Sequence, residues 1–381
     1  MCGALSGAAI AADAPKPAAP TLADVLDASG ISVTGYVDVS YEHLSGTGSF
    51  SSGTLDRVFD ARHDSFTVDQ AAFTIAKQPK EGFGAVVNIT AGQDAEVIKS
   101  YPVYGGANFD VTQAFVQYAT GPLTVIAGKF VTLAGAETIN PTTEYNFSRS
   151  ILFGYAIPFT HTGIRASYAL NDQFSFSVGV VNGWDEISDP NSQKTLEVGL
   201  NVTPIKAFSL AVNGYFGKEP LALSSSGPSA AQGQRSLVDV VATWNATDKV
   251  TLVLNYDHGS QNDDTANAAI GKYKWDGLAG YVNCQVTEQW RVALRGEYLN
   301  DKQGYRTGVT DAATGKGQKW KEGTLTFAYA PSKNFELRFE GRYDKSNVGT
   351  AFVKSVGVGS SYSTVYGNNQ SSVAVEGLFK F

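Results

Sequence analysis

Residues 371–381 read S-S-V-A-V-E-G-L-F-K-F, and their side chains alternate in character with a period of two. Val373, Val375 and Phe379 share one apolar face, whereas Glu376 lies on the opposite face. A segment of this length can cross the hydrocarbon layer as a tilted strand, with its terminal aromatic residues at the membrane interface. The stretch therefore predicts the closing strand of an outer-membrane β-barrel. A single segment of this kind also suits an edge strand of a soluble sandwich, so recurrence along the chain decides between the two.

The composition favours a folded, β-rich chain. Of the 381 residues, 43% are hydrophobic and 17% are charged, which gives no compositional sign of disorder. No run of eighteen apolar residues occurs, so the sequence predicts no membrane-spanning helix. Any membrane crossing must then use strands that close on themselves, because only closure pairs every backbone polar group. The net charge of −7 argues against nucleic acid as a partner, since no basic stripe is present to bind phosphates.

Segments of about ten alternating residues recur along the chain, as membrane-crossing strands require. Sixteen strands are predicted, at 31–42, 66–77, 82–92, 109–119, 122–131, 162–170, 173–183, 194–203, 207–216, 235–244, 249–258, 275–285, 290–301, 320–330, 334–344 and 371–381. Short turns, such as 78–81 and 331–333, alternate with long connections, such as 132–161. Short turns at one end and long loops at the other are typical of bacterial barrels. The predicted fold class is all-β, a transmembrane antiparallel barrel of about sixteen strands.

Charged side chains occupy one face of several predicted strands. In 335–343, for example, Phe335, Leu337 and Phe339 alternate with glutamates and arginines. A charge at mid-depth in lipid costs about 2–4 kcal/mol, so these groups are expected to face the interior of the barrel, which should hold water. The predicted pore-lining residues are Arg165, Arg291, Arg295, Glu297, Glu336, Arg338, Glu340 and Arg342. Alternatively, these arginines and glutamates form neutral cross-strand ladders that stiffen the wall.

The connection 132–161 differs from the other long loops because it is rich in apolar residues, among them Ile139, Phe147, Phe153 and Phe159. A solvated loop would not carry so many, so we expect this third long loop to fold into the lumen and narrow the pore. The predicted constriction residues are Glu137, Glu144 and Arg149. Acidic groups opposite the wall arginines would create a transverse field that selects solutes by charge or dipole. The alternative is an extracellular flap that packs on itself or on a neighbouring subunit.

The first thirty residues differ from the barrel pattern. Residues 1–11 are a short apolar run of small residues that ends in an A-x-A pattern, which indicates a truncated secretory signal peptide; an Ala-rich tail is the alternative. Residues 12–30 are predicted to lie in the periplasm as a Pro/Ala linker and a short helix, which Thr21 and Asp24 open with a capping box. The barrel is expected to occupy 31–381.

Two stretches carry a resemblance to a known family. They are G-K-F-V-T-L-A-G-A-E-T-I at 128–139 and N-F-S-R-S-I-L-F-G-Y-A-I-P-F-T-H-T-G-I-R-A at 146–166. Together with the opening strand, I-S-V-T-G-Y-V-D-V-S-Y, they resemble the β-barrel porin-2, OmpL-like family of Gram-negative bacteria, and the likeness extends over essentially the whole mature chain. The resemblance implies a general porin of the bacterial outer membrane, through which ions and small hydrophilic solutes diffuse passively. It implies no residue-level site.

Three further functions compete with the general porin. An outer-membrane enzyme would need a nucleophile with a positioned histidine, and the four histidines have no such setting, so we predict no catalytic residue, metal or cofactor. A substrate-selective channel and a plugged structural or adhesive barrel are both compatible with the strand pattern. The expected partners are outer-membrane lipids, small hydrophilic solutes and ions. By analogy with better-known sixteen-stranded porins, a homotrimer is the expected assembly.

Overall fold

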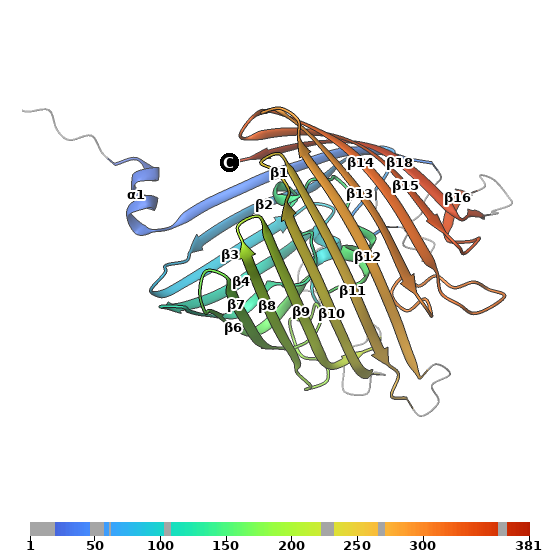
Figure 1. Cartoon of the computed structure of the whole chain (residues 1–381), viewed down its shortest axis with the longest axis horizontal. Helices are drawn as coiled ribbons and strands as arrows, with labels where there is room; N and C mark the ends of the chain where they lie inside the picture. Colours follow the sequence, from blue (N-terminus) through green and yellow to red (C-terminus); the bar gives the residue numbers. More distant parts are fainter. Residues whose placement is uncertain are drawn as a thin grey trace, which may run out of the picture.

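The computed structural model describes residues 20–45, 57–60, 62–102, 108–221, 232–265, 271–356 and 364–381. Sixteen of its strands form one closed antiparallel barrel (Figure 1). The barrel strands are β1 (Ser32–Leu44), β2 (Ser65–Lys77), β3 (Gly82–Ala91), β4 (Phe109–Thr120), β5 (Leu123–Val131), β6 (Thr160–Ala169), β7 (Phe174–Val181), β8 (Thr195–Ile205), β9 (Phe208–Pro220), β10 (Gln232–Asn245), β11 (Val250–Asn262), β12 (Lys272–Gln285), β13 (Trp290–Asp301), β14 (Lys319–Ser332), β15 (Phe335–Ser346) and β18 (Asn369–Lys380). The predicted fold class is confirmed.

The barrel closes between its first and last strands. In this seam Ser40 on β1 lies opposite Glu376 on β18. The N–H of Phe381 donates to the carbonyl of Gly35 over 2.9 Å. Position 35 favours a glycine, because an added Cβ would lie 2.9 Å from the backbone oxygen of Ala72 as well as 2.5 Å from the Phe381 ring. The alternating stretch at the end of the sequence therefore forms the closing strand that it predicts.

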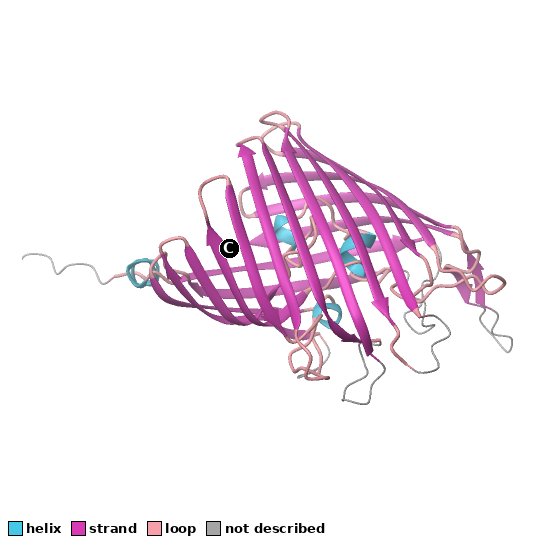
Figure 2. Cartoon of the chain, turned by 60° about the horizontal axis from the view of Figure 1, so that its bottom comes forward, coloured by secondary structure: helices cyan, strands magenta, loops and turns pink. Residues whose placement is uncertain are grey.

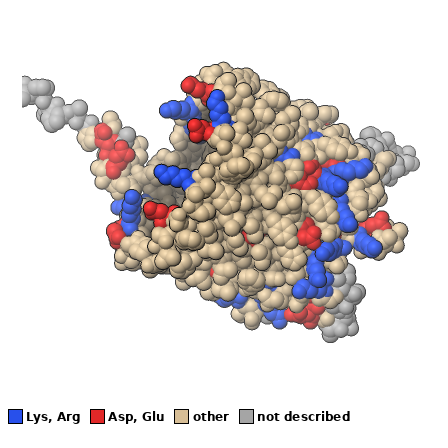
Figure 3. Space-filling view, viewed as in Figure 1, with Lys and Arg blue, Asp and Glu red and all other residues tan. Residues whose placement is uncertain are grey.

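Side chains alternate between the lipid-facing and lumen-facing sides of the wall. On β15, Phe339 and Tyr343 are exposed on the outside, whereas Arg338 and Arg342 are buried inside. Figure 3 shows that charged side chains gather toward the two ends of the visible surface and leave its middle mostly uncharged. An uncharged band between charged rims is what the hydrocarbon layer requires of a transmembrane barrel.

A short helix, α1 (Leu22–Ser29), precedes the barrel. The Thr21 side chain accepts a hydrogen bond from the N–H of Asp24, and the Asp24 carboxylate accepts one from the N–H of Thr21, which completes the predicted capping box. Figure 1 shows α1 beyond the end of the barrel rather than in the lumen. Among the described residues, no helix is long and apolar enough to span a membrane. The signal peptide predicted at 1–11 lies outside the described residues.

As far as the structure describes them, the long connections leave the end of the barrel opposite α1, which identifies that end as extracellular. They contain α2 (Ala95–Ile98), η2 (Pro141–Thr143), α3 (Ile151–Tyr155) and a hairpin of β16 (Phe352–Val356) and β17 (Thr364–Gly367) that the sequence pattern did not predict. Apolar side chains of these loops pack with inward-facing wall residues in one core, which includes Phe59, Ile98, Leu152, Phe153, Phe159, Trp184, Tyr215, Trp275, Trp320 and Phe352. The loops thus fill part of the lumen.

Candidate functional site

The connection between β5 and β6 runs through the inside of the barrel, and Figure 2 shows helical turns enclosed by the strands. Two caps fix its local path. The Asn140 side chain accepts a hydrogen bond from the N–H of Thr142 at the start of η2, and the Ser150 hydroxyl accepts one from the N–H of Phe153 at the start of α3. Gly135 adopts a φ of +95°, a left-handed conformation that suits glycine. We call the segment 132–159 the inner loop.

Two wall carboxylates hold the inner loop through its backbone. Glu340 on β15 accepts hydrogen bonds from the N–H groups of Phe147, at 2.7 Å, and Ser148, at 3.0 Å. Glu297 on β13 accepts those of the first two residues of α3, at 2.8 and 3.2 Å. The first N–H groups of a helix have no acceptor within it and carry partial positive charge. Glu297 therefore caps α3 from a different part of the chain.

Arg295 on β13 joins the inner loop to the wall. Its guanidinium lies 2.9 Å from a carboxylate oxygen of Glu137 and 3.2 Å from one of Glu322. It also donates to the carbonyl of Ser148 at 2.6 Å. The Arg295 side chain is completely buried. A buried charge of this kind is stable only while its partners remain in place, so the wall and the inner loop stabilise each other.

Two arginines of β15 bind inner-loop carbonyls. Arg338 donates to the carbonyls of Pro141 and Glu144, at 2.9 Å in each case, and pairs with Glu376 on β18 at 3.0 Å. Arg342 donates to a further carbonyl of the inner loop at 2.7 Å. Arg338 and Arg342 face the interior of the barrel, as the alternation predicts. Their guanidinium groups, however, are hydrogen-bonded to backbone carbonyls of the inner loop.

Glu144 and Arg149 stabilise the inner loop from within. Arg149 donates to the carbonyls of Thr138, Phe147 and Ile139 at 2.9–3.0 Å. The Glu144 carboxylate accepts hydrogen bonds from the N–H of Thr138 at 2.6 Å and from its hydroxyl at 2.9 Å. Burial raises the pKa of Glu144 to about 7, although the Arg149 charge acts in the opposite direction. Glu144 therefore changes charge close to neutral pH.

Arg165 and Arg291 make cross-strand pairs. Arg165 on β6 lies 2.5 Å from Glu197 on β8, and its guanidinium stacks over the Phe130 ring at 4.3 Å. Arg291 on β13 lies 2.6 Å from Glu336 on β15. Each pair reaches across an intervening strand, β7 or β14, so it joins strands that are not neighbours and differs from the ladder of neighbouring strands that the sequence left open as an alternative.

Strands on both sides of β13–β15 also hold the inner loop, through polar residues that the sequence pattern did not mark as site residues. The Gln70 amide on β2 donates to the carbonyl of Ile139 at 2.9 Å. The Tyr215 hydroxyl on β9 accepts a hydrogen bond from the N–H of Leu133 at 2.9 Å. Both side chains lie on the lumen-facing side of their strands. The period-two alternation predicts this orientation but does not predict a contact with the inner loop.

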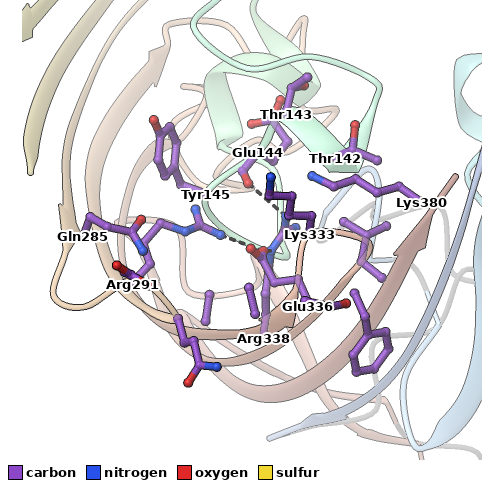
Figure 4. A pocket seen from close by; sticks show the side chains of 17 residues that line it. Thr142, Thr143, Glu144, Tyr145, Gln285, Arg291, Lys333, Glu336, Arg338 and Lys380 are labelled. Carbon is purple, nitrogen blue, oxygen red and sulfur yellow. Dashed lines mark hydrogen bonds and ion pairs between the residues drawn. The ribbon is translucent and has the colours of Figure 1, made fainter.

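Two cavities border the inner loop. The first, of about 440 Å³, lies against β1–β5, where its wall lining is neutral: Tyr36, Thr74, Asn88, Thr112 and Gln113. The second, of about 490 Å³, lies at the periplasmic ends of β12–β15 and β18, where its wall lining includes Gln285, Glu288, Arg291, Lys333, Glu336, Arg338 and Lys380. Figure 4 shows the second cavity, with the Lys333 and Lys380 side chains directed toward the inner loop. Thr143 lines both cavities.

Comparison with protein families identifies the chain. The model of the family described as "Putative beta-barrel porin-2, OmpL-like" matches residues 30–381. The chain belongs to this porin family. The match covers the entire barrel and begins after α1, and it confirms the resemblance seen in the sequence. Its membership places this porin in the bacterial outer membrane.

Solved porins share the fold of this porin. OmpT of Vibrio cholerae, folded in vitro and solved in a trimer form, superposes with a TM-score of 0.61 at 11% identity, over 92% of this chain and 99% of that one. An anion-selective porin from Comamonas acidovorans gives 0.61 at 12% identity, over 92% and 99% of the two chains. The channel DcaP of Acinetobacter baumannii gives 0.58 at 13% identity, over 92% and 97%. At this identity the likeness establishes the fold alone. No curated protein matches the sequence.

Proposed function

We propose that ions and small hydrophilic solutes diffuse passively through this porin along the inner loop. The observation that carries the proposal is that Thr143, the last residue of η2, lines both cavities, so that the two cavities approach each other at this residue. A solute that enters the first cavity passes the exposed side of Thr143 and leaves through the second cavity at the periplasmic end. In this pathway the gap at Thr143 limits solute size, and the cavity linings set the charge preference.

The charge preference follows from the second cavity. The Glu336 carboxylate lies 2.6 Å from both Arg291 and Arg338, so its charge is balanced. Within the part of the chain that the structure describes, Lys333 and Lys380 form no ion pair. These two ammonium groups outnumber the Glu288 carboxylate, which also lies in this lining without an ion pair among the described residues, so the periplasmic mouth attracts anions. Screening by salt limits the effect to about a Debye length. We therefore expect a modest preference for anions.

The predicted constriction residues divide into two proposed roles. Glu137 lines the first cavity and Glu144 lines the second, so both would meet the solute. Arg149 lines neither cavity, and its bonds to inner-loop carbonyls suit a positioning role. Arg295 and Glu340 on the wall would likewise position the inner loop, because both side chains are hydrogen-bonded to its backbone.

The proposal includes an assembly and a domain organisation. We infer a homotrimer that acts as a channel and not as an enzyme, in keeping with the porin family and with the trimer form of OmpT. Exposed apolar side chains on the outer wall, such as Phe66, Phe83 and Val116, would contact lipid or another subunit. Residues 1–11 would serve as a secretory leader, and 12–30 would lie in the periplasm, where the position of α1 at the short-turn end supports this placement.

Single-channel conductance in a planar bilayer tests the pathway. The native protein should give large open steps, and its reversal potential in a salt gradient should have the sign of a weak anion preference. Thr143→Trp should reduce the conductance several-fold, because the indole would occupy the space between the cavities. Thr120→Trp is the matched control, since Thr120 is exposed at the periplasmic end of β4 and borders neither cavity. Silence from a folded native barrel would refute the channel and favour a plugged barrel, and equal conductance of Thr143→Trp and Thr120→Trp would refute the pathway.

A further inference from the structure

Lysines gather on the outer surface at the extracellular ends of β12–β15. Figure 3 shows this concentration of basic side chains toward one end of the barrel. All are exposed, and they alternate along the strands with buried, inward-facing residues such as Trp275, Trp320 and Asp344. We call the group the lysine patch, and it consists of Lys272, Lys274, Lys302, Lys319, Lys321 and Lys345.

The lysine patch lies directly beyond the lipid-facing band. On the outer face of β14 and β15, Phe327 pairs with Phe339, Gly323 pairs with Tyr343, and Lys321 pairs with Lys345. The lysine pair therefore follows the exposed Tyr343 by one outward step, about 7 Å along the strands. Aromatic side chains of a membrane barrel mark the interface, so the ammonium groups lie at the depth of the lipid head groups.

The charge of the patch is poorly balanced by the protein. Lys321 and Lys345 are directly opposite each other in the ladder, an arrangement of like charges that destabilises a sheet. Within the described residues, neither Lys319 nor Lys321 forms an ion pair. The Lys345 amino group donates to the side-chain carbonyl of Asn368, at 3.1 Å, and has no ion pair with any residue that the structure describes, whereas Lys302 pairs with an aspartate. An anion between Lys321 and Lys345 would offset their repulsion.

We propose that the lysine patch binds the phosphate groups of an anionic lipid in the outer leaflet of the outer membrane. The patch faces the bilayer and not the lumen, which separates this site from the solute pathway. Directly below it, Leu325, Phe327 and Phe339 are exposed and apolar, so the same surface that binds the phosphates receives the acyl chains. Lysine binds phosphate as a point charge, and several lysines near a head group add their contributions.

Native mass spectrometry of the detergent-solubilised full chain, titrated with bisphosphorylated lipid A, tests the proposal. Lys321→Gln together with Lys345→Gln should weaken lipid A binding about 30-fold, at about 1 kcal/mol for each lysine. Lys206→Gln together with Lys249→Gln is the control, because it removes the same charge from exposed periplasmic turns and should leave binding unchanged. Dephosphorylated lipid A should bind the native protein at least as weakly as lipid A binds the double variant, because it loses the contributions of all the lysines in the patch.

Three outcomes would overturn the proposal. Equal affinity of the two double variants for lipid A would show that the patch is not the site. Equal affinity of the native protein for lipid A and for its dephosphorylated form would show that acyl chains alone drive binding. Displacement of lipid A by millimolar inorganic phosphate would show a site for free phosphate and not for a lipid.

Discussion

The inner loop has two sides, and the protein holds them by different means. Toward β13–β15, buried charges such as Arg295, Glu297 and Arg338 bind inner-loop backbone and carboxylate groups. Toward β1–β5, the direct hydrogen bonds are fewer, as in the bond from Gln70 to Ile139, and a cavity of about 440 Å³ remains beside them. The charges on this side, Asp38 and Asp94, attract Arg149 of the inner loop without a hydrogen bond to it. An inward-facing charge is therefore not by itself a pore residue. In this porin the inward-facing charges on β13–β15 that hydrogen-bond inner-loop groups are those of Arg295, Glu297, Arg338, Glu340 and Arg342.

The largest effect is expected from Arg295→Leu. The substitution leaves Glu137 and Glu322 without their shared partner in a buried setting, and breaking a buried pair in this way costs about 3–5 kcal/mol. The inner loop should also lose its attachment at Ser148, so single-channel conductance should rise and become noisier. Urea unfolding and bilayer recording measure the two effects.

Arg291→Leu sharpens this test on the same strand. Arg291 is partly exposed and pairs with Glu336, so its loss should destabilise the barrel much less and should instead reduce the anion preference. If Arg295→Leu and Arg291→Leu lowered stability equally, the distinction between anchoring and cavity-lining charges would be wrong.

An intermediate effect is expected from Gln113→Glu on the side of β1–β5. The side chain lines the first cavity and is half-buried, so an isosteric carboxylate can stay hydrated there. Unfolding stability should change by less than about 1 kcal/mol, whereas the reversal potential should move toward cations. Gln173→Glu makes the same charge change in an exposed turn and should leave the reversal potential as it is. An unchanged potential in Gln113→Glu would show that permeating ions do not pass this wall.

The smallest effect concerns pH. Because burial raises the pKa of Glu144 to about 7, the carboxyl is mostly neutral at pH 6 and mostly ionised at pH 8. The second cavity therefore gains negative charge as the pH rises, and the anion preference should weaken across this range. Glu144→Gln should remove that change, as measured by reversal potentials at the two pH values. A native protein whose selectivity is the same at pH 6 and pH 8 would contradict the assignment.

The barrel was predictable from the sequence because lipid imposes one simple rule on it. A strand such as β15 must place Phe339 and Tyr343 outside and Arg338 and Arg342 inside, so the alternation is visible without any knowledge of the partners. The inner loop was predictable for a similar reason, since its many apolar residues need a surface to pack against. Both inferences depend on local composition and period.

The contacts of the site were not predictable in the same way. Glu340 and Phe147 are 193 positions apart, and nothing near either residue indicates the other. The sequence showed which residues face inward. It did not show that Arg338 would donate hydrogen bonds to inner-loop carbonyls, or that Gln70 would bind the inner loop from β2. The hairpin of β16 and β17 was missed because its strands are short and do not belong to the membrane-crossing pattern.

The seam between β1 and β18 has a consequence for biogenesis. These two strands are the most distant in sequence of all the paired strands of the barrel, and β1 pairs with β18 from Tyr36 to Leu44. Until β18 has been synthesised and delivered, β1 and β15 each present an unpaired edge that invites aggregation and cannot be placed in lipid. Such a late, long-range closure slows folding. Assembly of this porin is therefore complete only when its closing strand has arrived.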